Sequence, residues 1–141
     1  MMACKNGHKD VVQLLLNQSS IEEANAIALG GWTAFIWACG GGNKDVVKLF
    51  LDRKDIELNA KTDITGVLEY TGFILACHWP HKDVVKLLLE YSEERNIELC
   101  DNLSEYDSMS KEMIDLVELH QEASKELKHF IEMHQTKRRK L

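Results

Sequence analysis

Three stretches decide the fold of this 141-residue chain: Lys9-Asp10-Val11-Val12-Gln13-Leu14-Leu15-Leu16, Lys44-Asp45-Val46-Val47-Lys48-Leu49-Phe50-Leu51 and Lys82-Asp83-Val84-Val85-Lys86-Leu87-Leu88-Leu89. Their aspartates are 35 and 38 residues apart. Self-similarity at such a period predicts a stack of short repeated units. Residues that recur in phase are expected to serve the stack, and residues that break the period are candidates for function.

Each stretch is predicted to be a helix that is covered on more than one side, because its apolar residues occupy a wide arc. A second apolar segment precedes two of the stretches, at 33–39 and at 71–77. Thr33 and Thr71 open these segments and are expected to cap their helices. Turn residues separate the two segments of each unit. Each unit is therefore predicted to be helix, tight turn, helix and extended connector.

Three of the four cysteines occupy one equivalent position in the repeat. Cys4, Cys39 and Cys77 each precede the aspartate of their stretch by six residues. Equivalent residues on packed helices lie about 8–10 Å apart, whereas a disulfide needs Cα atoms within about 7 Å. The cysteines also lack the C-x-x-C spacing of a zinc ribbon. We therefore expect small buried thiols.

Composition limits the classes of function. The formal net charge of −6 argues against general nucleic-acid binding, for which a basic face is expected. The apolar runs are too short to span a membrane, and the first dozen residues lack the apolar core of a signal peptide. An intracellular, soluble protein is expected.

The connectors repeat as well, since 55–60 is similar to 96–101 and 20–25 is a weaker copy. The positions that match a T-P-L-H-x-A motif are Thr33, Phe35, Ala38, Thr71, Phe73 and Ala76. With these positions in phase, the chain resembles the ankyrin repeat family over residues 1 to about 101. The resemblance implies an all-α, helix–turn–helix solenoid with short β-hairpin-type connectors. The family's usual Pro and His are replaced by Ala34 and Ile36, and by Gly72 and Ile74.

The predicted stack has a first, incomplete repeat at about 1–27, a second at 28–62 and a third at 63–101. The first repeat lacks its hairpin and the start of its first helix. This end is expected to be frayed, to be covered by a partner or to follow a lost upstream part. A truncated product or a fragment of a larger protein is the favoured interpretation.

Residues 102–141 are predicted to form an acidic loop, a helical cap and a basic tail. Strong helix formers run from 110 to about 135. One apolar stripe is formed by Met113, Ile114, Val117, Leu127, Phe130 and Ile131. This segment, as one bent helix or two, is expected to shield the third repeat.

Catalytic motifs do not occur in the sequence. It has no nucleophile elbow, phosphate loop, zincin helix or dinucleotide glycine pattern. The histidines at 120, 129 and 134 lack the i, i+4 pairing of a metal face. We therefore expect no enzyme, no catalytic or metal-binding residue, no cofactor and no small-molecule ligand.

The resemblance assigns binding to the hairpin tips and to the exposed ends of the first helices. The residues it selects are Lys5, Asn6, Trp32, Ile64, Val67, Leu68, Glu69, Tyr70, His78 and Trp79. Insertions in repeat proteins often mark the binding face, and the connector that contains 64–70 is three residues longer than its predecessor. Trp79 is the strongest candidate, because the following proline turns its backbone out of the helix.

Two of these aromatic residues have a structural alternative. Trp32 and Tyr70 could instead pack against neighbouring hairpins. Trp37 and Leu75 share a position that usually faces the next repeat, so both are expected in the core.

The expected function is non-catalytic binding of a protein partner that the sequence does not identify. A first alternative is a nuclear regulatory protein whose basic tail, Lys137-Arg138-Arg139-Lys140, directs import from the cytoplasm. A second is a fragment of a multidomain protein whose activity lies upstream. A small metalloenzyme is the third, and it would predict stoichiometric metal in the purified protein.

Overall fold

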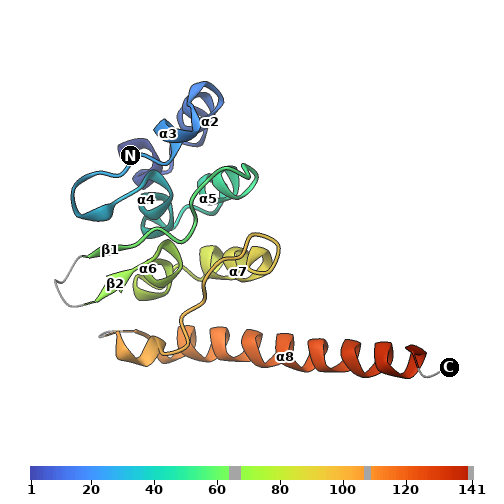
Figure 1. The fold of residues 1–141 in the computed structure, drawn as a ribbon. Helices are drawn as coiled ribbons and strands as arrows, with labels where there is room; N and C mark the ends of the chain where they lie inside the picture. Colours follow the sequence, from blue (N-terminus) through green and yellow to red (C-terminus); the bar gives the residue numbers. More distant parts are fainter. Residues whose placement is uncertain (64–67, 107–108, 140–141) are drawn as a thin grey trace.

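The computed structural model describes residues 1–63, 68–106 and 109–139, in which helix pairs stack side by side above one long helix (Figure 1). The first pair is α1 (Met2–Lys5) and α2 (Lys9–Gln18). The second is α4 (Ala34–Gly41) and α5 (Lys44–Leu51), and the third is α6 (Gly72–His78) and α7 (Lys82–Tyr91). The predicted all-α solenoid is confirmed.

Side-chain caps set the starts of these helices. The hydroxyl of Thr33 accepts a hydrogen bond from the backbone N–H of Ile36 at 3.2 Å, and Thr71 does the same for Ile74. An aspartate stands in the first turn of α2, α5 and α7, where a negative charge complements the helix dipole. The repeated sequence thus fixes where both helices of a pair begin.

The first connector contains a short helix, α3 (Ile21–Ala24), where the sequence comparison predicted an extended segment. Ser20 and Glu23 form a reciprocal capping box: the Ser20 hydroxyl accepts from the Glu23 N–H, and the Glu23 carboxylate accepts from the Ser20 N–H. This motif satisfies two backbone donors and favours a helical turn. The prediction of an extended connector was wrong here, because it rested on similarity to the other connectors and did not take the Ser20–Glu23 capping box into account.

The connector between the second and third pairs forms a hairpin. Strand β1 (Thr62–Asp63) pairs antiparallel with β2 (Glu69–Tyr70), with Thr62 opposite Tyr70. The short 3-10 helix η1 (Leu29–Gly31) lies beside β1, and the Thr62 hydroxyl donates to the Gly30 carbonyl. Two predicted contact residues, Ile64 and Val67, lie outside the described residues.

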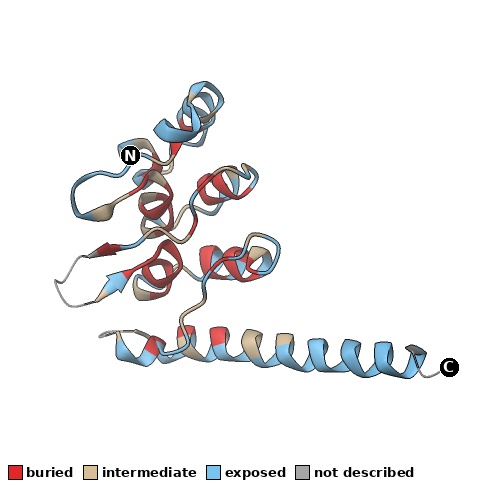
Figure 2. Cartoon of the chain, in the orientation of Figure 1, coloured by how far each residue is buried: buried red, intermediate tan, exposed pale blue. Residues whose placement is uncertain are grey.

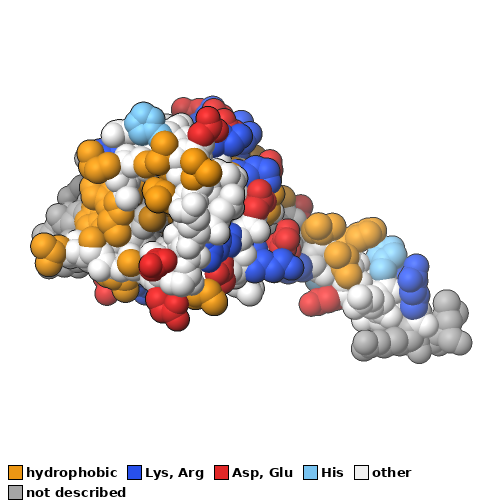
Figure 3. Space-filling model, turned by 90° about the horizontal axis from the view of Figure 1, so that it is seen from above, with side chains coloured by type: hydrophobic (Ala, Val, Ile, Leu, Met, Phe, Trp, Pro, Cys, Tyr) orange, Lys and Arg blue, Asp and Glu red, His pale blue; other side chains and the backbone are white. Residues whose placement is uncertain are grey.

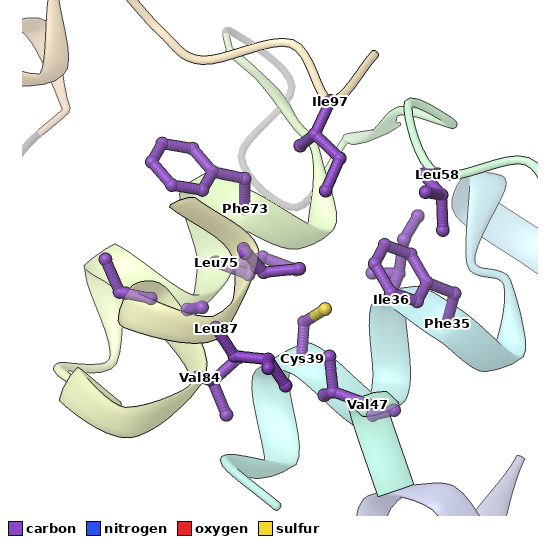
Figure 4. Close-up of a cluster of buried hydrophobic side chains, with 14 of the residues drawn as sticks. Phe35, Ile36, Cys39, Val47, Leu58, Phe73, Leu75, Val84, Leu87 and Ile97 are labelled. Carbon is purple, nitrogen blue, oxygen red and sulfur yellow. The ribbon is translucent and has the colours of Figure 1, made fainter. Parts of the chain in front are cut away.

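The core lies where the second and third pairs meet (Figure 2). Figure 4 shows side chains from α4 to α7 pointing toward one another, with Leu58 and Ile97 of the connectors above them. The predicted core residue Leu75 is fully buried. Cys4, Cys39 and Cys77 are buried free cysteines, and burial raises the pKa of the Cys39 and Cys77 thiols. The expectation of buried thiols is confirmed.

Asparagine side chains join consecutive connectors. The Asn25 amide donates to the Asp55 carbonyl at 2.7 Å and accepts from the Glu57 N–H at 2.8 Å. Asn59 repeats this pattern one connector later, with the Asn96 carbonyl and the Glu98 N–H, both at 2.8 Å. Each asparagine therefore satisfies a donor and an acceptor on the next connector and fixes the spacing of the stack.

Below the third pair, the chain passes through η2 (Leu103–Glu105) and enters α8 (Lys111–Arg139), a single continuous helix. Met113 and Val117 are buried beneath α7, and Lys82 of α7 forms an ion pair with Glu112. The first part of α8 therefore packs beneath the third pair, and the sequence's C-terminal helical extension is present as α8. The rest projects beyond the stack (Figure 1), so the predicted stripe residues Leu127, Phe130 and Ile131 are exposed instead of covering the third pair.

Among the described helices, α8 included, none is long and apolar enough to cross a membrane.

Candidate functional site

A row of aromatic side chains crosses the second and third helix pairs on the hairpin side. Trp32, which follows η1, stacks on Trp37 of α4 with ring centroids 4.2 Å apart. Both side chains are half-buried. We call Trp32, Trp37, His78 and Trp79 the aromatic row.

A lysine from the first pair borders this row. The ammonium of Lys5 lies 5.2 Å from the ring centroid of Trp37, a separation at which a cation is attracted to the ring face. Lys5 and the adjacent Asn6 are exposed at the end of α1. The predicted contact residues Lys5, Asn6 and Trp32 therefore lie together on the surface.

Gly40 lies between Trp37 and Trp79 of the aromatic row. It lies three residues after Trp37, on the same side of α4. A Cβ atom at position 40 would come within 2.9 Å of the Trp79 ring, so the glycine leaves the space that this ring occupies. Trp79 itself directly follows α6 as its C-cap and is 38% exposed. The absent side chain thus lets Trp79 lie against the surface of the preceding pair.

His78 continues the row toward the hairpin. Its ring lies 5.9 Å from that of Trp79 and 5.8 Å from that of Tyr70. The Nδ1 atom of His78 is buried and, within the described part of the chain, has no hydrogen-bond partner. A buried polar atom of this kind is costly unless a further group satisfies it.

Tyr70 is not part of the exposed surface. Its side chain is only 3% exposed, because it packs edge-on against Tyr106, whose hydroxyl donates to the Glu69 carbonyl. The prediction of Tyr70 as a contact residue is therefore corrected, and the alternative of packing describes it. At the rim of the hairpin, Leu68 is partly buried, and Glu69 is exposed with its carboxylate 3.4 Å from the Lys61 ammonium.

Trp37 was expected in the core together with Leu75, and it packs against the core with only part of its side chain. The indole is larger than the leucine side chain and extends between Trp32 and Lys5, so it stays half-buried. The replacement of leucine by tryptophan at an equivalent position was the available signal.

The basic tail lies far from this row. Lys137 and Arg138 are exposed on the last turn of α8, and Arg139 ends the helix. Lys140 lies outside the described residues.

A second apolar area covers the end of the stack formed by the first pair. Val11 and Leu15 are about half exposed, whereas their counterparts in the second pair, Val46 and Phe50, are buried. Figure 3 shows hydrophobic side chains gathered on this end face. The difference arises because α2 covers α5, while the described chain places no helix over α2.

Chemically, the aromatic row offers π faces, apolar area and a cation beside them. In the ranges that the structure describes, no group of three or more His, Cys, Asp or Glu side chains could hold a metal ion.

Comparison with known families agrees with this architecture. A family model described as ankyrin repeats, in three copies, matches residues 1–101. A search of curated proteins finds no match.

Proposed function

The chain belongs to the ankyrin repeat family, and from that premise we propose that it is a non-catalytic module that binds a partner protein through the aromatic row. Lys5 and Asn6 would border the contact at one end, and Leu68 and Glu69 at the other. Ankyrin repeats are typically protein-interaction modules, and the coarse class of activity follows from the family. The residues that make the contact are our proposal.

The observation that supports it is that three tryptophans remain accessible, since Trp79 is 38% exposed and Trp32 and Trp37 are only half-buried. Tryptophan is enriched among the residues whose truncation costs protein complexes most of their affinity. Trp32 and Trp37 support each other, and Trp79 lies on Gly40. These rings are held in place before binding, so a partner would lose little conformational entropy in ordering them.

Quantitative binding tests the proposal. A partner is first captured with the wild-type chain and purified, and its affinity is then measured for Trp79→Ala, Trp37→Ala and wild type. We expect each substitution to weaken binding at least about tenfold, which corresponds to about 1.4 kcal/mol, with helicity unchanged. Trp79→Phe should retain part of the affinity.

Leu14→Ala is the matched control, since Leu14 is an exposed apolar residue of α2, three residues after Val11 of the end face, and is not part of the aromatic row. It should bind as wild type does. If Leu14→Ala weakens binding and both tryptophan variants do not, the end face is the binding surface and the proposal fails.

For the location of the protein, we propose the cytoplasm, with nuclear import through the basic tail as the second candidate. The exposed Lys137 and Arg138 at the tip of a projecting helix favour access by an import receptor. A fluorescent reporter fused to residues 135–141 tests the second candidate. Nuclear accumulation that is lost on Lys137→Ala/Arg138→Ala supports it, and uniform distribution contradicts it.

A further inference from the structure

The projecting part of α8 exposes a stripe of apolar side chains. Leu119, Leu127 and Phe130 are 67%, 60% and 58% exposed. Together with the half-buried Leu116 and with Ala123, they recur at helical spacing and therefore lie on one side of α8. Figure 3 shows hydrophobic side chains gathered on the part of the helix that leaves the stack. We call Leu116, Leu119, Ala123, Leu127 and Phe130 the α8 stripe.

The stripe is symmetric about Ala123. Leu116 and Leu119 precede Ala123 by seven and four residues, and Leu127 and Phe130 follow it by four and seven. A helix with this pattern presents the same spacing when it is read in the opposite direction. A two-fold axis that passes through Ala123 would therefore pair the stripe with itself, which is the condition for an isologous contact between identical chains. Alanine at the centre also lets two helices approach closely.

Charge favours the antiparallel direction. From 111 to 122, α8 carries one lysine against the four carboxylates of Glu112, Asp115, Glu118 and Glu122. With the axis at Ala123, these residues face 124–135 of the partner subunit, a segment that carries two lysines, Lys125 and Lys128, and two glutamates. Antiparallel pairing therefore places the acidic half of one helix beside a segment without net charge, whereas parallel pairing places two acidic halves together.

The position of the stack leaves the stripe accessible. The helix pairs lie over the first half of α8, and the second half extends past them (Figure 1). A groove of about 310 Å³ between α7 and α8 continues the stripe. It is lined by Lys86, Leu89 and Glu90 of α7 and by Leu116, Leu119 and His120 of α8. A second helix that packs along the α8 stripe would therefore enter this groove near Leu116 and Leu119.

We propose that a second copy of this chain packs antiparallel along the α8 stripe to form a two-fold symmetric dimer. Leu119 of each chain contacts Leu127 of the partner subunit, Leu116 contacts Phe130 of the partner subunit, and the two Ala123 residues meet at the axis. Each repeat stack then lies over the acidic half of its own helix, and the aromatic rows of both chains stay exposed. This contact does not depend on the proposed partner binding.

The mass of the full chain in solution tests the dimer. Light scattering over a concentration series should give a mass that rises from 16.1 kDa to twice that value. Leu127→Glu should raise the dissociation constant at least about tenfold, because it buries a carboxylate against an apolar partner. Leu14→Glu is the matched control, since Leu14 is 62% exposed on α2, and it should leave the dimer unchanged.

Three results would overturn the proposal. One is a mass of 16.1 kDa at every concentration up to the solubility limit. Another is dissociation by Leu14→Glu and not by Leu127→Glu, which would place the contact on the end face of the stack. The last is growth beyond two chains, since the symmetric contact is closed.

Disulfide cross-linking tests the direction and register. In a Cys100→Ser background, Leu119→Cys and Leu127→Cys chains are prepared separately, one with a mass tag, and are oxidised alone and mixed. Antiparallel pairing predicts that the 119–127 heterodimer in the mixture exceeds either homodimer several-fold, because only these two positions come within disulfide distance. Parallel pairing would favour the homodimers, and equal yields would indicate random collision. Either result contradicts the proposed dimer.

Discussion

The Nε2 atom of His81 lies 2.9 Å from the carbonyl oxygen of Gly40, so the residue before α7 is tied to the end of α4 in the preceding helix pair. His81 stands in the turn between the two helices of its own pair, where a local hydrogen bond would span only a few residues. The bond instead spans 41 residues. Gly42, with φ at +72°, provides the space, because a Cβ atom there would come within 2.3 Å of the His81 ring. The turn glycine and the histidine therefore serve contact between repeats.

Replacing His81 by alanine removes this bond and leaves a helix-terminal carbonyl without its partner. We expect the free energy of unfolding to fall by about 1 kcal/mol, measured by urea unfolding followed by circular dichroism. His8→Ala is the matched control, since His8 occupies the same position in the first repeat and is exposed. Its effect should stay within about 0.5 kcal/mol. Equal losses for both variants would show that the Gly40 contact adds no stability.

Asn59→Ala should loosen the contact between the second and third connectors. The Glu98 N–H loses its acceptor, and the Asn96 carbonyl loses its donor. A loss of about 1 kcal/mol corresponds to roughly fivefold faster hydrogen exchange at the Glu98 amide, which NMR can measure. The Glu57 amide, bound in the same way by Asn25, is the internal control and should exchange at its wild-type rate. An unchanged rate at Glu98 would contradict the prediction.

Met113→Ala should destabilise the stack by about 2–5 kcal/mol, because it leaves a cavity under α7. Met113 is 1% exposed, whereas Met133 on the same helix is 48% exposed. Met133→Ala should therefore change the free energy of unfolding by no more than about 0.5 kcal/mol. Thermal unfolding of both variants beside wild type provides the comparison. Similar melting temperatures for the two would mean that α8 does not cap the third repeat.

The buried cysteines should react with alkylating reagents more slowly than the half-buried Cys100. Burial disfavours the thiolate, which is the reactive form, so it raises the pKa of Cys77 to about 12 and also raises the pKa of Cys39. At mildly alkaline pH we expect Cys39 and Cys77 of the native protein to be alkylated at least about tenfold more slowly than the half-buried Cys100. Peptide mass spectrometry reports each site. In urea all four should react alike, and equally fast labelling of Cys39 and Cys100 before unfolding would contradict the burial.

Local sequence signals predicted the helix pairs well. Thr33, Thr71 and the recurrent aspartates act within one turn of their own position, so their effect can be read without tertiary information. The capping box of Ser20 and Glu23 was equally readable, since it needs only two residues at a fixed spacing.

Whether an aromatic side chain is buried or exposed depends on residues that are distant in the sequence. Trp32 and Tyr70 precede equivalent threonines, yet Tyr70 is buried because Tyr106, 36 residues further along the chain, packs against it. Likewise, the apolar pattern of α8 predicts a stripe but not how far α7 reaches along it. The burial of Tyr70 and the covered length of α8 both depend on contacts between segments that come together only in the folded chain.

The straight course of α8 also separates charges. Within the described residues, the last ion pair between α8 and the stack joins Lys128 to Glu93 at 3.2 Å. From Lys128 to Arg138 a helix advances about 15 Å, at 1.5 Å per residue. Because the Debye length is about 8 Å in physiological salt, the field of the acidic repeats is largely screened at the helix tip. An approaching molecule would therefore meet two electrostatically independent bodies on one chain, an acidic stack and a basic tip held apart by a helical rod.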